Sequence, residues 1–151
     1  MFDGLNFVGN ISEEDLIELS HEDNAVEYSS YLENFFLLES STLLEAVQMM
    51  YANQSNILPI INEQSRYVAS ITENDIIGAF ASFPFVSSEG VSMLVSISEK
   101  DLSITAISNI IEGNNGKILG LMVVGNKEDR VYVLLKFSTS NLLAIGETYE
   151  R

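Results

Sequence analysis

Two short stretches of the sequence place a hydroxyl and a carboxylate three residues apart, where an apolar run gives way to a helical pattern. The pairs are Thr72 with Asp75 and Ser12 with Asp15. A carboxylate can accept hydrogen bonds from two hydroxyl groups, and the free N–H groups at a helix start can bind an anion. The same pairs can also simply cap their own helices. The residues alone leave both roles open.

The two stretches belong to an internal repeat, because residues 7–17 align with residues 67–77 at an offset of 60. The first copy predicts a strand over residues 7–11 and a helix over residues 13–19. The second copy predicts a strand that runs directly into a helix. A unit repeated in this way is expected to bury its apolar face against its twin.

The second copy ends a β-hairpin. Two apolar runs, residues 57–61 and residues 67–71, flank a polar turn over residues 62–66, and this pattern is typical of two antiparallel strands. The helix that follows the hairpin is predicted to reach residue 83. Pro59 has no backbone N–H group, so we expect it at a sheet edge, at a bulge or facing a ligand.

Ahead of the hairpin, residues 31–39 predict a strand, and a helix capped by Ser41 or Thr42 follows. The resulting order of strand, helix, strand, strand and helix resembles the cystathionine-β-synthase (CBS) domain. Two hallmarks of that family are present, a Leu-Pro pair in the second strand and the Ser/Thr-x-x-Asp motif before the last helix. The resemblance covers residues 31–83, and Ala69 stands where the family usually has Gly.

The resemblance implies a ligand of the adenosine type, AMP or adenosine, in a cleft between paired CBS units. In that family the Asp of the motif binds ribose hydroxyls and the Ser/Thr lies near the phosphates. Main-chain groups of the first strands hold the base. Carried over to this sequence, the implied ligand-binding residues are Asp75, Thr72, Ile57, Pro59, Asp15 and Ser12.

The second half of the chain predicts a β-α-β-β-α unit, one strand short of the ferredoxin-like pattern. This order resembles the ACT family of small regulatory domains, and a CBS region followed by an ACT-like region is similar to bacterial proteins of the acetoin-utilisation type. The predicted elements are a strand over residues 91–97, a helix from residue 102, a strand over 117–124, a turn over 125–130, a strand over 131–137 and a helix over 138–150.

Together these patterns predict a mixed α+β fold with several segments. Residues 1–20 resemble the tail of a first CBS repeat, so the chain resembles a fragment of a longer protein that starts inside that repeat. The remaining predicted segments are a linker over residues 21–30, a CBS repeat over 31–83, a linker over 84–90 and an ACT-like domain over 91–151 that lacks its last strand.

Composition excludes several classes of function. The net charge of −15 argues against nucleic acid as a partner, and residues 1–65 hold twelve acidic residues without any Lys or Arg. The absence of Cys and the single His argue against a zinc site. The sequence holds no long apolar run and no signal peptide, so we expect no membrane span and a cytoplasmic location.

No catalytic motif stands out, so we expect a protein that is not an enzyme. Two functions stay open. The first is a regulatory or sensor module that binds an adenine nucleotide. The second is a ligand-free module for dimerisation or protein interaction. A homodimer is expected in either case, because an incomplete CBS repeat and an incomplete sheet both leave apolar faces uncovered.

Overall fold

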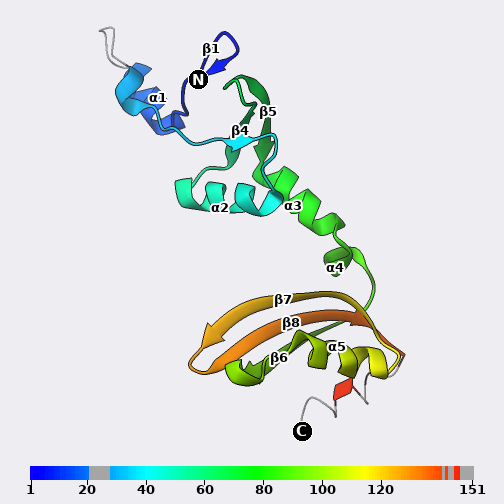
Figure 1. The fold of residues 1–151 in the computed structure, drawn as a ribbon. Coiled ribbons are helices and arrows are strands. Elements are labelled where there is room, and N and C mark those ends of the chain that lie inside the picture. Colours follow the sequence, from blue (N-terminus) through cyan, green and yellow to red (C-terminus); the bar gives the residue numbers. More distant parts are fainter. Residues whose placement is uncertain (21–27, 141, 143–144, 147–151) are drawn as a thin grey trace. The chain divides into compact units, whose positions relative to one another are not determined.

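The computed structural model describes residues 1–20, 28–140, 142 and 145–146 of the 151-residue chain (Figure 1). They belong to two compact units, Met1–Ala79 and Phe80–Arg151, which divide within helix α3 (Glu73–Ser82). Both units contain helices as well as strands, so the predicted mixed α+β fold is confirmed. Most of the predicted linker over residues 21–30 lies outside the described residues, and its last part forms a 3₁₀ turn, η1 (Tyr28–Tyr31).

The N-terminal part of the first unit differs from the sequence prediction. The prediction of a strand over residues 7–11 is wrong. Strands β1 (Phe2–Asp3) and β2 (Asn6–Phe7) form a two-residue ladder that ends before Val8. The chain then pairs elsewhere, with Asn10 and Glu33 exchanging backbone hydrogen bonds of 2.7 and 2.8 Å. A Cβ atom at Gly9 would lie 2.9 Å from Cβ of Leu32, so this close approach requires glycine. Helix α1 (Glu13–Ser20) follows as predicted.

The rest of the first unit is a three-stranded sheet with two helices. The sheet has the order β3 (Leu37–Leu38), β4 (Ile57–Ile61) and β5 (Tyr67–Thr72), with β3 parallel to β4 and β5 antiparallel to it. Helix α2 (Leu43–Asn53) connects β3 to β4, and α3 follows β5. The predicted strand–helix–strand–strand–helix order is confirmed, although its first strand shrinks from residues 31–39 to two residues.

Pro59 is accommodated by the short reach of β3. Strand β4 is central in the sheet, but β3 pairs with it at Ile60 and Ile61 alone. On the side facing β3, Pro59 therefore lies where β4 behaves as an edge, and the missing N–H group breaks no ladder there. Its other neighbour is Ser70 of β5, and the Pro59 side chain is buried.

The second unit is an antiparallel sheet with the order β6 (Val91–Ser98), β8 (Arg130–Ser138) and β7 (Lys117–Lys127). Helix α5 (Ile104–Gly113) joins β6 to β7 after a 3₁₀ turn, η2 (Glu99–Asp101). Its Ile107 and Ile111 pack on the core face of the sheet with the inward side chains of β8. The shared core consists of Val95, Ile107, Ile111, Val131, Val133, Leu135, Phe137 and Ile145.

Three details of the second unit correct the sequence predictions. The predicted linker over residues 84–90 contains a short helix, α4 (Pro84–Ser87), whose Phe85 covers Gly120 on the sheet face opposite α5. The predicted turn over residues 125–130 shrinks to Glu128 and Asp129, because β7 runs on to Lys127. The predicted helix over 138–150 cannot begin at Ser138, which ends β8, and residues 141, 143–144 and 147–150 of it lie outside the described part.

Membrane-spanning helices and metal-binding clusters are both absent from the described residues. None of the helices there is both long enough and apolar enough to cross a bilayer. The same residues also hold no group of three or more His, Asp or Glu side chains placed to bind a metal ion.

Candidate functional site

The candidate site lies where β5 runs into α3. Thr72 ends the strand and pairs with Ile57, the first residue of β4. The next residue, Glu73, donates its backbone N–H to the carbonyl oxygen of Asn56 at 3.0 Å. The start of β4, the end of β5 and the N-terminus of α3 are therefore held together by backbone pairing.

Thr72 and Asp75 form a reciprocal cap at the start of α3. The Asp75 Oδ2 atom accepts hydrogen bonds from the Thr72 hydroxyl at 2.6 Å and from its backbone N–H at 2.8 Å. Thr72 Oγ1 in turn accepts from the Asp75 N–H at 3.3 Å. The side-chain bond and then the backbone bond from Thr72 lower the pKa of Asp75. Asp75 is therefore an anion at neutral pH, with one oxygen engaged by the cap.

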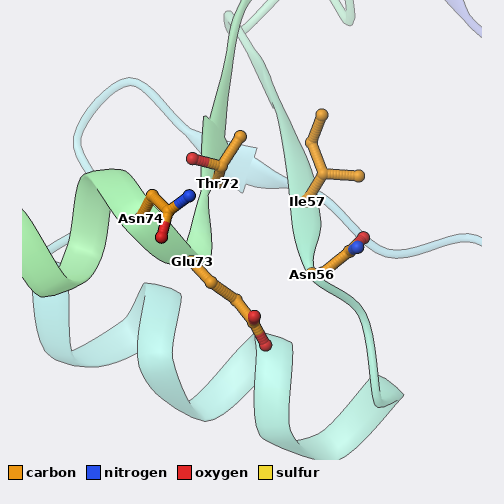
Figure 2. A pocket seen from close by; sticks show the side chains of 5 residues that line it. All are labelled: Asn56, Ile57, Thr72, Glu73 and Asn74. Carbon is orange, nitrogen blue, oxygen red and sulfur yellow. The ribbon is translucent and has the colours of Figure 1, made fainter.

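A hollow of about 330 Å³ opens at this junction. Figure 2 shows the five described side chains that line it, at the end of β5, the start of α3 and the start of β4. Two of them, Ile57 and Thr72, are among the six residues implied by the resemblance. The other three are Asn56, Glu73 and Asn74.

The other four implied residues are not among the described residues that line the hollow. Asp75 is two residues beyond Glu73 and holds Thr72 in place from the first turn of α3. Pro59 lies two residues into β4, with its side chain buried. Ser12 and Asp15 are at the start of α1, where Ser12 Oγ donates to Asp15 Oδ2 at 2.6 Å and accepts from the Asp15 N–H at 3.0 Å.

The internal repeat therefore holds for the helix start and not for the strand before it. The hydroxyl–carboxylate cap recurs at Ser12 and Thr72, because it depends on residues three apart in the chain. The second copy adds a strand that pairs with β4, whereas the first copy has no such strand at residues 7–11. The hollow forms at the second copy, where the strand, its partner and the helix start meet.

Sequence reasoning did not single out Asn56 and Asn74. Each stands beside an element boundary that was recognised, the start of β4 and the first turn of α3. A signal was present, since Asn offers both a donor and an acceptor. Which of the neighbouring polar residues face one hollow depends on the pairing of Ile57 with Thr72, which sequence spacing does not give.

The charge around the hollow is negative. The unit Met1–Ala79 contains 14 acidic residues and one cation, Arg66, which gives it a net charge of −13. Glu73 itself lines the hollow. The backbone N–H groups of the α3 start offer a partial positive charge, but no lysine or arginine is among the described lining residues.

Comparison with known proteins places this site in a recognised segment. Residues 32–82 match the CBS domain. The resemblance to that family is thus confirmed for this stretch, which we call the CBS segment, and it contains β3, α2, β4, β5 and α3. No curated protein matches the chain.

Solved structures with similar folds include several CBS proteins. A CBS domain pair/ACT domain protein from Thermotoga maritima is 22% identical, with a TM-score of 0.42 over 50% of this chain and 62% of that chain. The cytosolic domain of the Mg²⁺ channel MgtE, in complex with ATP, is 18% identical, with a TM-score of 0.44 over 52% of this chain and 32% of that chain.

A CBS domain protein from Shewanella oneidensis is 20% identical, with a TM-score of 0.39 over 53% of this chain and 65% of that chain. The match thus spans less than two thirds of each of these three chains. Likenesses of this size concern the fold alone.

Proposed function

We propose that the chain is a non-catalytic regulatory module whose CBS segment binds an adenosine-type ligand, adenosine or AMP, in the hollow beside Thr72. The observation that carries this proposal is the position of the hollow. It lies inside the CBS segment, at the start of the helix that carries the Thr72–Asp75 pair. The resemblance of the second unit to ACT domains remains a prediction, as does the resemblance of the chain to proteins of the acetoin-utilisation type.

The contacts around the hollow suit a nucleoside. One oxygen of the Asp75 carboxylate is engaged by Thr72, which leaves the other to accept a ribose hydroxyl. The apolar side chain of Ile57, 48% exposed, offers a surface for the base. Asn56 and Asn74 offer amide groups that can donate to and accept from the ligand.

Charge favours a ligand with few phosphates. Each added phosphate would bring negative charge beside Glu73, in a unit whose net charge is already −13. The N–H groups at the start of α3 can bind one phosphate, as helix N-termini do in other proteins. We therefore expect adenosine and AMP to bind more tightly than ADP and ATP.

A thermal-shift panel tests this proposal with adenosine, AMP, ADP, ATP and S-adenosylmethionine, each with and without magnesium. A ligand at 100 times its Kd stabilises the folded state by about 2.7 kcal/mol, which is readily seen as a rise in Tm. A shift for adenosine or AMP that exceeds the shift for ATP is the expected result. If no compound of the panel raises the Tm, the ligand proposal is wrong.

The capping box of α2 offers a matched control for the site. Thr42 and Glu45 make the same reciprocal bonds at the start of α2, with Glu45 Oε2 accepting from the Thr42 N–H at 2.6 Å. Asp75→Asn and Glu45→Gln therefore remove the negative charge from equivalent caps, while each amide oxygen can still accept the capping hydrogen bonds. We expect Asp75→Asn to weaken AMP binding at least tenfold in isothermal calorimetry and Glu45→Gln to leave it unchanged. Equal affinities would remove Asp75 from the site.

The alternative function is a ligand-free interaction module, and helix α2 provides the observation that favours it. Leu44 and Tyr51 on this helix are 65% and 88% exposed, and Val47 between them is 36% exposed. Their spacing of three and four residues places them along one side of the helix. A homodimer remains part of the proposal under either function.

A further inference from the structure

The two outer strands of the β6-β8-β7 sheet differ in how they are protected. Strand β7 shows two register shifts against β8, carries a Lys at each end, and has Gly120 covered by Phe85. Bulges, lysines and covering segments are the devices that keep sheet edges from pairing with other chains. Strand β6 (VSMLVSIS) has neither charge nor Pro, and all its eight residues pair with β8 without a shift.

The β6 edge also leaves apolar surface uncovered. Val91, Met93 and Ile97 face the core but are partly buried. Their partners on β8, Phe137, Leu135 and Val131, are at most 5% exposed. Among the described residues, β6 pairs with β8 and with no strand on its other side. A further strand beside β6 would both satisfy its backbone groups and cover these side chains.

The residue pattern of β6 favours a second copy of the same strand as this neighbour. From Val91 to Ile97 the order of residue types is apolar, Ser, apolar, apolar, apolar, Ser, apolar, which is the same in both directions around Leu94. In an antiparallel pair, residues directly opposite each other share a face of the sheet. Two copies of β6 centred on Leu94 would thus place Met93 opposite Val95, with apolar pairs on the core face. On the other face they would place Ser92 opposite Ser96.

We propose that two copies of the chain dimerise by antiparallel pairing of β6 with β6, centred on Leu94, to form one continuous six-stranded sheet. Such an interface is isologous, and a strand with a symmetric pattern suits it. Charge supports the second unit as the place of contact. Phe80–Arg151 has eight acidic and six basic residues, a net charge of −2, so two copies repel each other less there than at the −13 unit.

This inference rests on the expected homodimer and not on the adenosine ligand. The two proposals can fail separately. A chain whose β6 edge is blocked keeps its hollow in the first unit, so Leu94→Lys should retain the AMP-dependent rise in Tm. Asp75→Asn, conversely, should retain the dimer. These two readouts distinguish a failed interface from a failed ligand site.

A pair of matched lysine substitutions tests the interface. Leu94 on β6 and Met122 on β7 are both exposed, at 59% and 46%, and both pair with Leu134 of β8. In the proposed dimer of Leu94→Lys, the two introduced lysines would face each other across the axis, and like charges directly opposite are unfavourable. Sedimentation equilibrium of the 151-residue chain should show a dimer Kd at least tenfold higher for Leu94→Lys, and an unchanged Kd for Met122→Lys.

The outcomes of that experiment are decisive in both directions. An equimolar mixture of Leu94→Lys and Leu94→Glu should regain the dimer, because the opposed charges then attract, and this result excludes misfolding as the cause of dissociation. A wild-type chain that stays monomeric at high micromolar concentration would overturn the proposal, as would a Leu94→Lys chain that dimerises like the wild type. Equal weakening by Met122→Lys would also overturn it.

Single cysteines test the register, because the chain has no Cys of its own. Paired Cα atoms in an antiparallel ladder lie within the range that a disulfide spans, so Leu94→Cys should cross-link two copies under mild oxidation. Two Ser92→Cys side chains would be four residues out of register, about 13 Å apart, and should not cross-link. A mixture of Ser92→Cys and Ser96→Cys should. Cross-linking of Ser92→Cys alone as fast as Leu94→Cys would refute this register.

Discussion

Helices α2 and α3 of the first unit leave Leu44, Tyr51 and Ile77 between 64% and 88% exposed, whereas β8 of the second unit holds Val133, Leu135 and Phe137 at 0%. The difference follows from the strands. The first unit has strands of two to six residues, and the sheet of the second unit has strands of eight to eleven. Long strands with an alternating pattern bury a complete row of side chains on one face.

The two units also differ in how they present charge and polar groups. The first carries nearly all the net negative charge and holds the hollow with its capped helix start. The second is almost neutral, and its buried side chains form one hydrophobic cluster between the sheet and α5. Under the two proposals, ligand recognition would belong to the unit with the polar hollow, and assembly to the unit whose β6 edge is unpaired among the described residues.

The largest expected effect comes from the core of the second unit. Leu135→Ala should lower the free energy of unfolding by about 2–5 kcal/mol, because Leu135 is completely buried and the vacated volume cannot be refilled. Ile77→Ala, on a residue 64% exposed in the first unit, should change it by about 0.5 kcal/mol or less. Urea unfolding that is monitored by hydrogen exchange measures the change in the free energy of unfolding for both variants. A large loss for Ile77→Ala would show that α3 is covered in solution, and the comparison would then break down.

Glycine substitutions should have opposite signs in the two units. A Cβ atom at Gly116, between α5 and β7, would lie 2.8 Å from the carbonyl oxygen of Ile111, so Gly116→Ala should destabilise by about 1–3 kcal/mol. Gly78 lies within α3 with nothing in the way of a Cβ atom, so Gly78→Ala should stabilise by about 0.5–1 kcal/mol. Thermal unfolding of the two variants gives the signs. A lower Tm for Gly78→Ala would contradict the open surroundings of that helix.

The smallest expected effect is a dependence on acid pH that is confined to the first unit. Bonds from Thr72 lower the pKa of Asp75, and backbone and side-chain bonds from Thr42 lower the pKa of Glu45. A lowered folded-state pKa means that the stabilisation is complete above the ordinary carboxyl pKa of about 4. It is lost as the pH falls through the lowered value. Helix α5, capped by Ser103 on the N–H of Ala106, has no such carboxylate.

Hydrogen exchange at several pH values can separate these helices once the intrinsic pH dependence is subtracted. Protection of the first turns of α2 and α3 should fall below about pH 4, while that of α5 stays constant. Asp75→Asn should remove the pH dependence of α3 and leave that of α2. An equal loss of protection in α5 would point to general acid unfolding in place of titrating caps.

The sequence by itself determined the elements whose causes are local. Thr72 with Asp75, and Ser12 with Asp15, are caps made by residues three apart, and the structure contains both. The hairpin strands, α1, α2, α5 and β6 were all predicted from periodicity within one element, with boundaries shifted by a few residues. The CBS resemblance was likewise readable, because Leu58-Pro59 and the Thr72–Asp75 motif lie within one short stretch.

The tertiary structure decided the features that depend on partners far apart in the chain. Residues 9–10 leave the expected strand because Asn10 pairs with Glu33, and β3 is short because it meets β4 at two positions. Asn56 joins Asn74 at the hollow because Ile57 pairs with Thr72. Among the described residues, the outer edge of β6 is unpaired because β8, which follows β7 in the chain, inserts between β6 and β7. Which strands of the chain become neighbours depends on residues far apart in sequence, and periodicity within single strands did not predict the order β6-β8-β7.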